Sequence, residues 1–129
     1  MKILGIGVDV IQNKRIKSLI NNKNFINRTF GQNEVKLSKK ISDKTNYFAK
    51  RFAAKEAFVK AIGEGFRNDI NFVDIDIINN KKGKPSINIS NKIKKFLKKK
   101  FRIKKYKIFL SLSDEKKYSI AYVIINKNK

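Results

Sequence analysis

The sequence predicts an α+β fold, a single domain in which a long helix packs on a mainly antiparallel sheet. Three observations predict it: an apolar strand pattern opens the chain, a long helical pattern occupies residues 44–62, and two strand–turn–strand patterns separated by a further helix follow. With 129 residues, 41% of them hydrophobic, the chain fits one domain spanning 1–129, and no repeat or linker divides it.

The first element is the apolar run at residues 3–11, which contains Gly5, Gly7 and Asp9. Its branched residues predict a buried strand. A glycine within a strand lets another group approach the backbone closely, and a carboxylate in an apolar strand is unusual. Asp9 is therefore a candidate functional residue.

A helical region is expected next, with three short helices at 13–20, 25–31 and 33–40. Ser42 and Asp43 offer an N-cap for the long helix 44–62, and Gly63 and Gly65 are expected to end it. At about 100° per residue, four apolar residues of the long helix share one face: Phe48, Phe52, Val59 and Ile62.

Glu56 lies at the edge of that apolar face. A carboxylate there costs free energy unless an opposite charge compensates for it. Lys60, four residues on, is one possible partner, in the favourable Glu-to-Lys orientation. A metal ion shared with Asp9 is the other, because magnesium usually takes one or two protein carboxylates. Two isolated carboxylates on two core elements thus indicate a candidate site for a hard cation.

The second half of the chain predicts two hairpins with a helix between them. Residues 72–78 alternate as a half-buried strand does, 79–85 form a turn, and 86–89 return as the partner strand. Ser90 is a candidate cap for a helix with Ile93, Phe96 and Leu97 inward. The last two strands are expected at 106–113 and 118–125.

The composition excludes several kinds of chemistry. The chain has no Cys and no His, so disulfides, thiolate or imidazole metal ligation, and Ser-His or Cys-His catalysis are excluded. No apolar run reaches the roughly 18 residues of a membrane span, and the start of the chain lacks the layout of a signal peptide. A cytoplasmic protein is expected.

The net charge of +22 arises from 32 Lys and Arg against 10 Asp and Glu. One interpretation is an anionic partner, such as nucleic acid, a membrane surface, or an acidic protein with a phosphorylated cofactor. The other is compositional drift, since Lys, Asn and Ile are residues that A/T-rich codons supply. The densest basic run, 92–107, is expected to be a solvated face.

Four short blocks occur in order along the chain. They are IGVD at 6–9, the stretch 50–65 with RFAAKEAFVK at its centre, GKP at 83–85, and SLS at 111–113 with YSIA at 118–121. Together they resemble the 4'-phosphopantetheinyl transferase superfamily over the whole chain, and its small bacterial branch, the holo-acyl-carrier-protein synthases, most closely.

This resemblance implies a transferase that moves 4'-phosphopantetheine from coenzyme A to a serine of apo-acyl carrier protein in fatty acid biosynthesis. It implies that Asp9 and Glu56 bind Mg2+, which also holds the pyrophosphate of coenzyme A, and that Lys60 contacts the phosphates. The products would be holo-carrier protein and adenosine 3',5'-bisphosphate. Whether Glu56 or a metal-bound water takes the serine proton stays open, although a tight ligand makes a poor free base.

The resemblance also implies residues that bind coenzyme A. In the Gly83-Lys84-Pro85 turn, glycine permits close approach of the backbone, Pro85 stiffens the loop and Lys84 supplies charge for a phosphate. Arg51 is a candidate for the 3'-phosphate, because guanidinium binds phosphate bidentately. The alternatives are an ordinary turn for 83–85 and a solvated helix face for Arg51.

Arg15, with Arg28 and Phe25, falls where the family docks the acidic helix of the carrier protein, and a solvated face is the alternative. The family implies a homotrimer with active sites between subunits, which would suit a small domain with sheet edges to cover. Intact Asp9, Glu56 and Lys60 argue against a degenerate member kept for structure only.

The chain departs from the commonest family pattern at two positions. Gln12 stands where relatives often carry a glutamate near the metal, which would leave Asp9 and Glu56 as the protein ligands with a water substituting. Asp114 stands where many relatives have histidine and others aspartate, and its role is open. A basic nucleic-acid-binding module is the rival interpretation, but no RNA-binding signature is present, so no nucleic-acid partner is expected.

Overall fold

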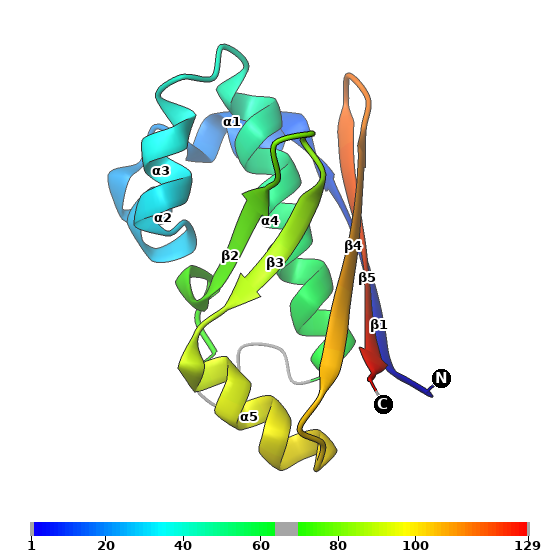
Figure 1. Cartoon of the computed structure of the whole chain (residues 1–129). Helices are drawn as coiled ribbons and strands as arrows, with labels where there is room; N and C mark the ends of the chain where they lie inside the picture. The colour runs from blue at the N-terminus through cyan, green and yellow to red at the C-terminus, as the bar shows by residue number, and fades with distance from the viewer. Residues whose placement is uncertain (1, 64–69, 129) are drawn as a thin grey trace.

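The structure is a computed structural model that describes residues 2–63 and 70–128. Its larger layer is an antiparallel three-stranded sheet in the order β1 (Lys2–Gln12), β5 (Tyr118–Lys127), β4 (Tyr106–Asp114). The long helix α4 (Lys44–Ile62) packs on one face of this sheet (Figure 1). The predicted fold class is therefore confirmed.

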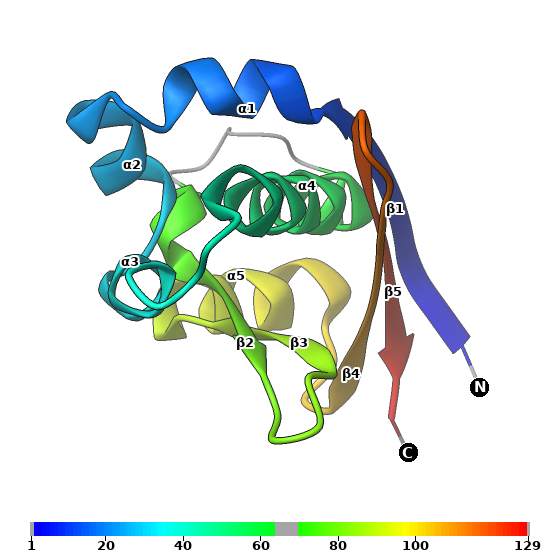
Figure 2. The same cartoon turned by 90° about the horizontal axis from the view of Figure 1, so that it is seen from above.

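The remaining elements surround α4. They are α1 (Asn13–Leu19), α2 (Lys23–Thr29), α3 (Gln32–Ser38), a 3-10 turn η1 (Phe72–Asp74), the hairpin β2 (Ile75–Asn79) and β3 (Pro85–Ile89), and α5 (Asn91–Phe101). Figure 2 shows α1 on one side of α4, the β2–β3 hairpin on the other, and the three-stranded sheet along a third side. Helix α4 is thus enclosed rather than laid on a surface.

This central position buries more of α4 than the predicted apolar face. Buried residues occur all around the helix, including Ala49, Ala53 and Ala57 at 0% exposure. Their small side chains let the neighbouring elements come close. The approach to β1 is the tightest: a Cβ at Gly7 would lie 1.9 Å from the Ala57 carbonyl oxygen. The predicted reason for a glycine at this position is confirmed.

The prediction that β1 is a buried strand is wrong. One face of the strand lies against α4, but the other is open, and Ile6, Val8 and Val10 are 52–60% exposed. An apolar run does not show which faces of a strand are covered by the chain's own core. The sequence pattern alone therefore did not reveal the open face.

The local signals at the ends of α4 are largely confirmed. Asp43, not Ser42, is the N-cap: its Oδ1 accepts a hydrogen bond from the Asn46 backbone N–H at 3.0 Å. Gly63 ends the helix in the left-handed conformation with φ of 77°. Gly65 lies outside the described residues.

In the second half, the predicted strand at 72–78 begins later than expected. Residues 72–74 form the 3-10 turn, and β2 starts at Ile75. The Ser90 cap is present, since its Oγ accepts from the Ile93 backbone N–H at 3.4 Å, and Ile93 and Leu97 are fully buried.

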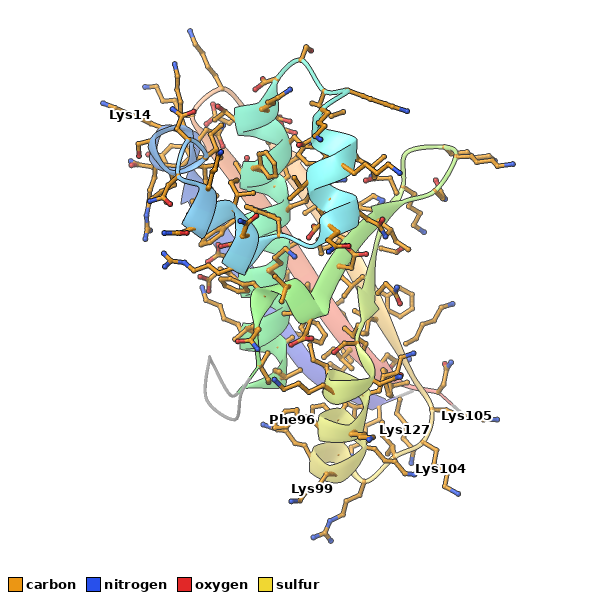
Figure 3. All side chains as sticks on the ribbon, turned by 90° about the vertical axis from the view of Figure 1, so that its left-hand side faces the viewer. Lys14, Phe96, Lys99, Lys104, Lys105 and Lys127 are labelled. Carbon is orange, nitrogen blue, oxygen red and sulfur yellow. The ribbon has the colours of Figure 1, made fainter. Side chains whose placement is uncertain are left out.

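The basic run 92–107 is a solvated face, as expected. Its lysines are all exposed, and Figure 3 shows Lys99, Lys104 and Lys105 extending from the α5 end of the molecule, at the opposite end from Lys14. None of the helices in the described parts of the chain is long and apolar enough to cross a membrane.

Candidate active site

Asp9 and Glu56 meet at the contact between β1 and α4. Asp9 pairs with Ala121 of β5 in the sheet register, and Ala121 is fully buried on the face that α4 covers. The close approach of α4 at Gly7 brings the Glu56 carboxylate within electrostatic reach of Asp9. Both carboxylates are half-buried, with 14% of the Asp9 side chain exposed.

Two basic residues flank this pair. The Lys60 ammonium donates hydrogen bonds to Asp9 Oδ1 and to the Val8 carbonyl oxygen, each at 3.1 Å. Lys60 therefore pairs with Asp9 and not with Glu56, contrary to the simple helix pair that four-residue spacing allowed. Arg15 on α1 lowers the pKa of both carboxylates through its charge, which places it beside the site.

The positive charges near Asp9 and Glu56 do not fully compensate for the burial of the two carboxylates. Burial raises the pKa of Asp9 above its ordinary value, against the opposing effects of Lys60 and Arg15. Burial raises the pKa of Glu56 as well, and the negative charge of Asp9 adds to that effect. Among the residues that the structure describes, none forms a hydrogen bond or ion pair with the Glu56 carboxylate.

These residues fit a magnesium ion. Two adjacent carboxylates with raised pKa values, one of them unpartnered, are a donor set that a hard divalent cation would complete, with waters and phosphate oxygens filling its other positions. Within the described ranges, no group of three or more acidic, histidine or cysteine side chains is placed to hold a metal. The pair therefore offers the two protein ligands expected in a chain with Gln12.

The Gly83-Lys84-Pro85 turn lies at a different place, on the other side of α4. It lines a cavity of about 350 Å3 together with Lys50 of α4 and residues of β4. The turn is ordered by its own hydrogen bonds: Asn80 Oδ1 accepts from the backbone N–H of Lys84 at 2.9 Å, and Gly83 has φ of 83°. Lys84 itself is exposed at the cavity.

Arg51 is not among the residues that line this cavity, and its burial corrects the alternative of a solvated helix face, whereas its contact with the 3'-phosphate stays a prediction. It is 6% exposed, so it is not on a solvated helix face. Its guanidinium stacks on the Tyr47 ring at 3.7 Å from the centroid and donates to Asn79 Oδ1 at 2.7 Å. Asn79 in turn donates to the Gly83 carbonyl oxygen at 2.9 Å. Arg51 thus stabilises the turn indirectly, through the side chain of Asn79.

Comparison with known proteins gives the family. Residues 5–123 match the family model described as the 4'-phosphopantetheinyl transferase superfamily. The holo-[acyl-carrier-protein] synthase of Pelagibacter ubique is 58% identical over 127 residues, covering 98% of this chain and 99% of that protein. The same enzyme of Orientia tsutsugamushi is 44% identical, covering 96% and 97%. The chain belongs to the holo-[acyl-carrier-protein] synthases of this superfamily.

Solved structures of such synthases share its fold. The crystal structure from Neisseria meningitidis superposes with a TM-score of 0.88 at 36% identity, covering 98% of this chain and 100% of that one. The Bacillus anthracis synthase, in complex with CoA (3',5'-ADP), gives a TM-score of 0.81 at 32% identity, covering 98% of each chain.

The synthase residues expected to dock the carrier protein are split between surface and core. Arg15 and Arg28 are exposed. Phe25 is 6% exposed and packs against Phe30 and Phe52, with ring centroids 6.0 Å from each. Phe25 and Arg28 both line a cavity of about 330 Å3, so Phe25 belongs to the core, and its contact with the carrier protein stays a prediction.

Sequence reasoning missed the charged residues that α4 buries. Lys55 is fully buried, and its ammonium donates to Glu34 Oε1 at 2.6 Å and to the Phe72 carbonyl oxygen at 2.9 Å. Glu34 also accepts from the Gly31 backbone N–H at 3.0 Å. The absence of any local partner for Lys55 on its own helix was the available signal. This ion pair ties α3 and the start of β2 to α4.

Proposed function

We propose that this synthase transfers 4'-phosphopantetheine from coenzyme A to a serine of apo-acyl carrier protein, in a Mg2+-dependent reaction of fatty acid biosynthesis in the cytoplasm. The single observation that carries the proposal is the Asp9–Glu56 pair, half-buried and short of positive charge, with Lys60 beside it. The coenzyme bound to the Bacillus anthracis relative supports coenzyme A as the donor.

In this proposal each residue of the site has a separate role in binding or catalysis. Mg2+ held by Asp9 and Glu56 would neutralise charge that develops on the pyrophosphate as the bond to the 4'-phosphopantetheine group breaks. Lys60, whose side chain is 54% exposed, is free to turn its ammonium from Asp9 to a phosphate oxygen of the departing adenosine 3',5'-bisphosphate. Arg15 and Arg28 supply positive charge for the acidic carrier protein.

The decisive experiment is intact-mass spectrometry of apo-acyl carrier protein after incubation with the synthase, coenzyme A and Mg2+. We expect the carrier protein to gain one phosphopantetheine group, and chelation of Mg2+ with EDTA to abolish the gain. No gain under conditions in which a characterised synthase modifies the same carrier protein would disprove the proposal.

We also propose that the synthase works as a homotrimer with active sites between subunits. Two observations support assembly through the outer face of the three-stranded sheet. That face carries a contiguous set of apolar side chains that are 40–60% exposed, which is unusual for a monomer: Ile6, Val8, Val10, Phe109, Ile120 and Tyr122. The carboxylate pair and the Lys84 cavity share no residue within one chain, and a cyclic assembly can bring them together.

The assembly is tested by Val10→Glu, which places a charge in the middle of that apolar face. In size-exclusion chromatography with light scattering, we expect the wild-type protein to elute as a trimer and the variant as a monomer. In the mass-spectrometric assay of the carrier protein, we expect the variant to show little transferase activity. Leu37→Glu is the matched control, since Leu37 is 49% exposed on α3 and away from the sheet. A trimeric Val10→Glu protein, or a monomeric wild type with full activity, would contradict the proposal.

A further inference from the structure

The cavity beside the Gly83-Lys84-Pro85 turn contains a charge that a phosphate site should not need. Lys50 and Lys84 line it, as expected for an anion, but so does the carboxylate of Asp114. Asp114 ends β4 and forms an ion pair with Lys50, with the Nζ and Oδ1 atoms 3.6 Å apart. Its other oxygen accepts a hydrogen bond from the Asn46 side chain.

The Lys50–Asp114 ion pair is long and partly exposed, so it can be broken at little cost in free energy. Its side chains are 29% and 35% exposed, and 3.6 Å is long for a charge-assisted hydrogen bond. The ion pair of Lys55, on the same helix, with Glu34 differs in both respects: it is 2.6 Å long, and its side chains are 0% and 1% exposed. An exposed pair of this kind contributes little stability, so an anion of higher charge competes for the lysine readily.

The phosphate that enters this cavity follows from the proposed function, on which this inference rests. Coenzyme A carries a pyrophosphate and a 3'-phosphate. The pyrophosphate belongs at the Asp9–Glu56 metal site, which leaves the 3'-phosphate for the second cationic site. Arg51, the residue suggested for it by the sequence, is buried behind Asn79, so Lys50 and Lys84 are the cations that the cavity itself offers.

We infer that Asp114 and Lys50 form an exchangeable ion pair at the coenzyme A site. The 3'-phosphate displaces Asp114 from Lys50, and Asp114, still held by Asn46, then lies beside the bound phosphate as a like charge. Lys50 sets the preference for coenzyme A over its form without the 3'-phosphate, and Asp114 limits that preference and so eases release of adenosine 3',5'-bisphosphate.

The test is calorimetric titration of the synthase with coenzyme A and with dephospho-coenzyme A, in Mg2+ at one ionic strength. Lys50→Met should weaken binding of coenzyme A about tenfold, the effect of losing a hydrogen bond to a charged group, and leave dephospho-coenzyme A unchanged. Asp114→Asn should tighten binding of coenzyme A roughly threefold, the scale of a partly exposed ion pair, again with no effect on dephospho-coenzyme A. In the double variant the gain from Asp114→Asn should be smaller than in the wild-type background, because the part of the effect that acts through Lys50 is lost and only the like-charge repulsion is relieved.

Glu115→Gln is the control for a general change in charge. It removes the same charge one residue further along, in a side chain that accepts from the Lys117 backbone N–H and does not line the cavity. The inference is overturned if Glu115→Gln reproduces the effect of Asp114→Asn, or if either cavity variant changes both ligands equally. A wild-type protein that binds neither ligand would disprove the proposed function as well, whereas binding of both ligands with no selective effect would overturn this inference alone.

Discussion

Glu56→Gln is expected to lower the rate of phosphopantetheine transfer at least ~100-fold while making the metal-free protein more stable. Loss of an outer-shell partner of a metal site already costs roughly 10- to 100-fold, and Glu56 is proposed as one of only two protein ligands. The amide keeps the size of the side chain but cannot replace the charge of the carboxylate.

The gain in stability follows from the sign of the pKa shift. Burial and the charge of Asp9 raise the pKa of Glu56 in the folded protein. A carboxyl whose pKa is higher folded than unfolded lowers the stability at any pH above its unfolded pKa, and this penalty disappears as the pH falls through the raised value. Glutamine removes the penalty, so the Tm of the metal-free variant should exceed that of the wild type at neutral pH and converge with it in acid.

Calorimetric melting without and with Mg2+ measures the stability of the metal-free protein and the stabilisation that the metal adds. Mg2+ should raise the Tm of the wild type and have little effect on Glu56→Gln, because ligands stabilise only the state that binds them. Glu115→Gln is the matched control, since it removes an exposed carboxylate that lies outside the site. A fully active Glu56→Gln protein, or a wild type whose Tm is insensitive to Mg2+, would remove Glu56 from the metal site.

Lys55→Met is expected to destabilise the folded protein by about 3–5 kcal/mol, the typical result of removing one partner of a buried ion pair. The Glu34 carboxylate, 1% exposed, would keep its hydrogen bond from Gly31 but lose its nearest cation, and among the described residues Arg51 at 3.9 Å would be the remaining one. The carbonyl oxygens of Phe72 and Ile75 would lose the Lys55 ammonium as a hydrogen-bond donor as well. The active site would suffer only indirectly, through the looser attachment of α3 and β2 to α4.

Urea unfolding at a fixed protein concentration tests this value. Desolvation already raises the pKa of Glu34, so protonation of the unpaired carboxyl should shrink the deficit of Lys55→Met as the pH falls. Addition of Glu34→Gln to Lys55→Met should recover part of the loss, because no buried charge then lacks a partner. Lys99→Met, on the exposed side of α5, should change stability by less than roughly 0.5 kcal/mol. Equal losses for Lys55→Met and Lys99→Met would refute the assigned role.

Local signals made α4 predictable from the sequence. The capping carboxylate of Asp43 and the left-handed Gly63 act within one turn of the helix ends, so the expected range 44–62 agrees with the structure. The start of β2 was less predictable, because the alternation at residues 72–74 is the same in a strand and in the 3-10 turn that the chain adopts.

The proximity of the two candidate site residues was predictable where a carboxylate conflicted with its own element, as at Asp9 and Glu56. The positions of Arg51 and Lys55 were not, because α4 is enclosed on most sides and its sequence gives little contrast between buried and exposed faces. Pairs such as Lys50 with Asp114 depend on how β4 passes α4, which no short-range pattern records.

The pairing of β1 with β5 also determines when the enzyme can first exist during its synthesis. Among the described strands, β1 has β5 as its hydrogen-bonded neighbour, and Asp9 is held opposite Ala121. A ribosome makes the chain from the N-terminus, so the strand that carries Asp9 waits unpaired while more than a hundred residues are added. The proposed metal site therefore cannot reach its final geometry before β5 has been synthesised, and β1, with its apolar side chains, needs protection from aggregation until then.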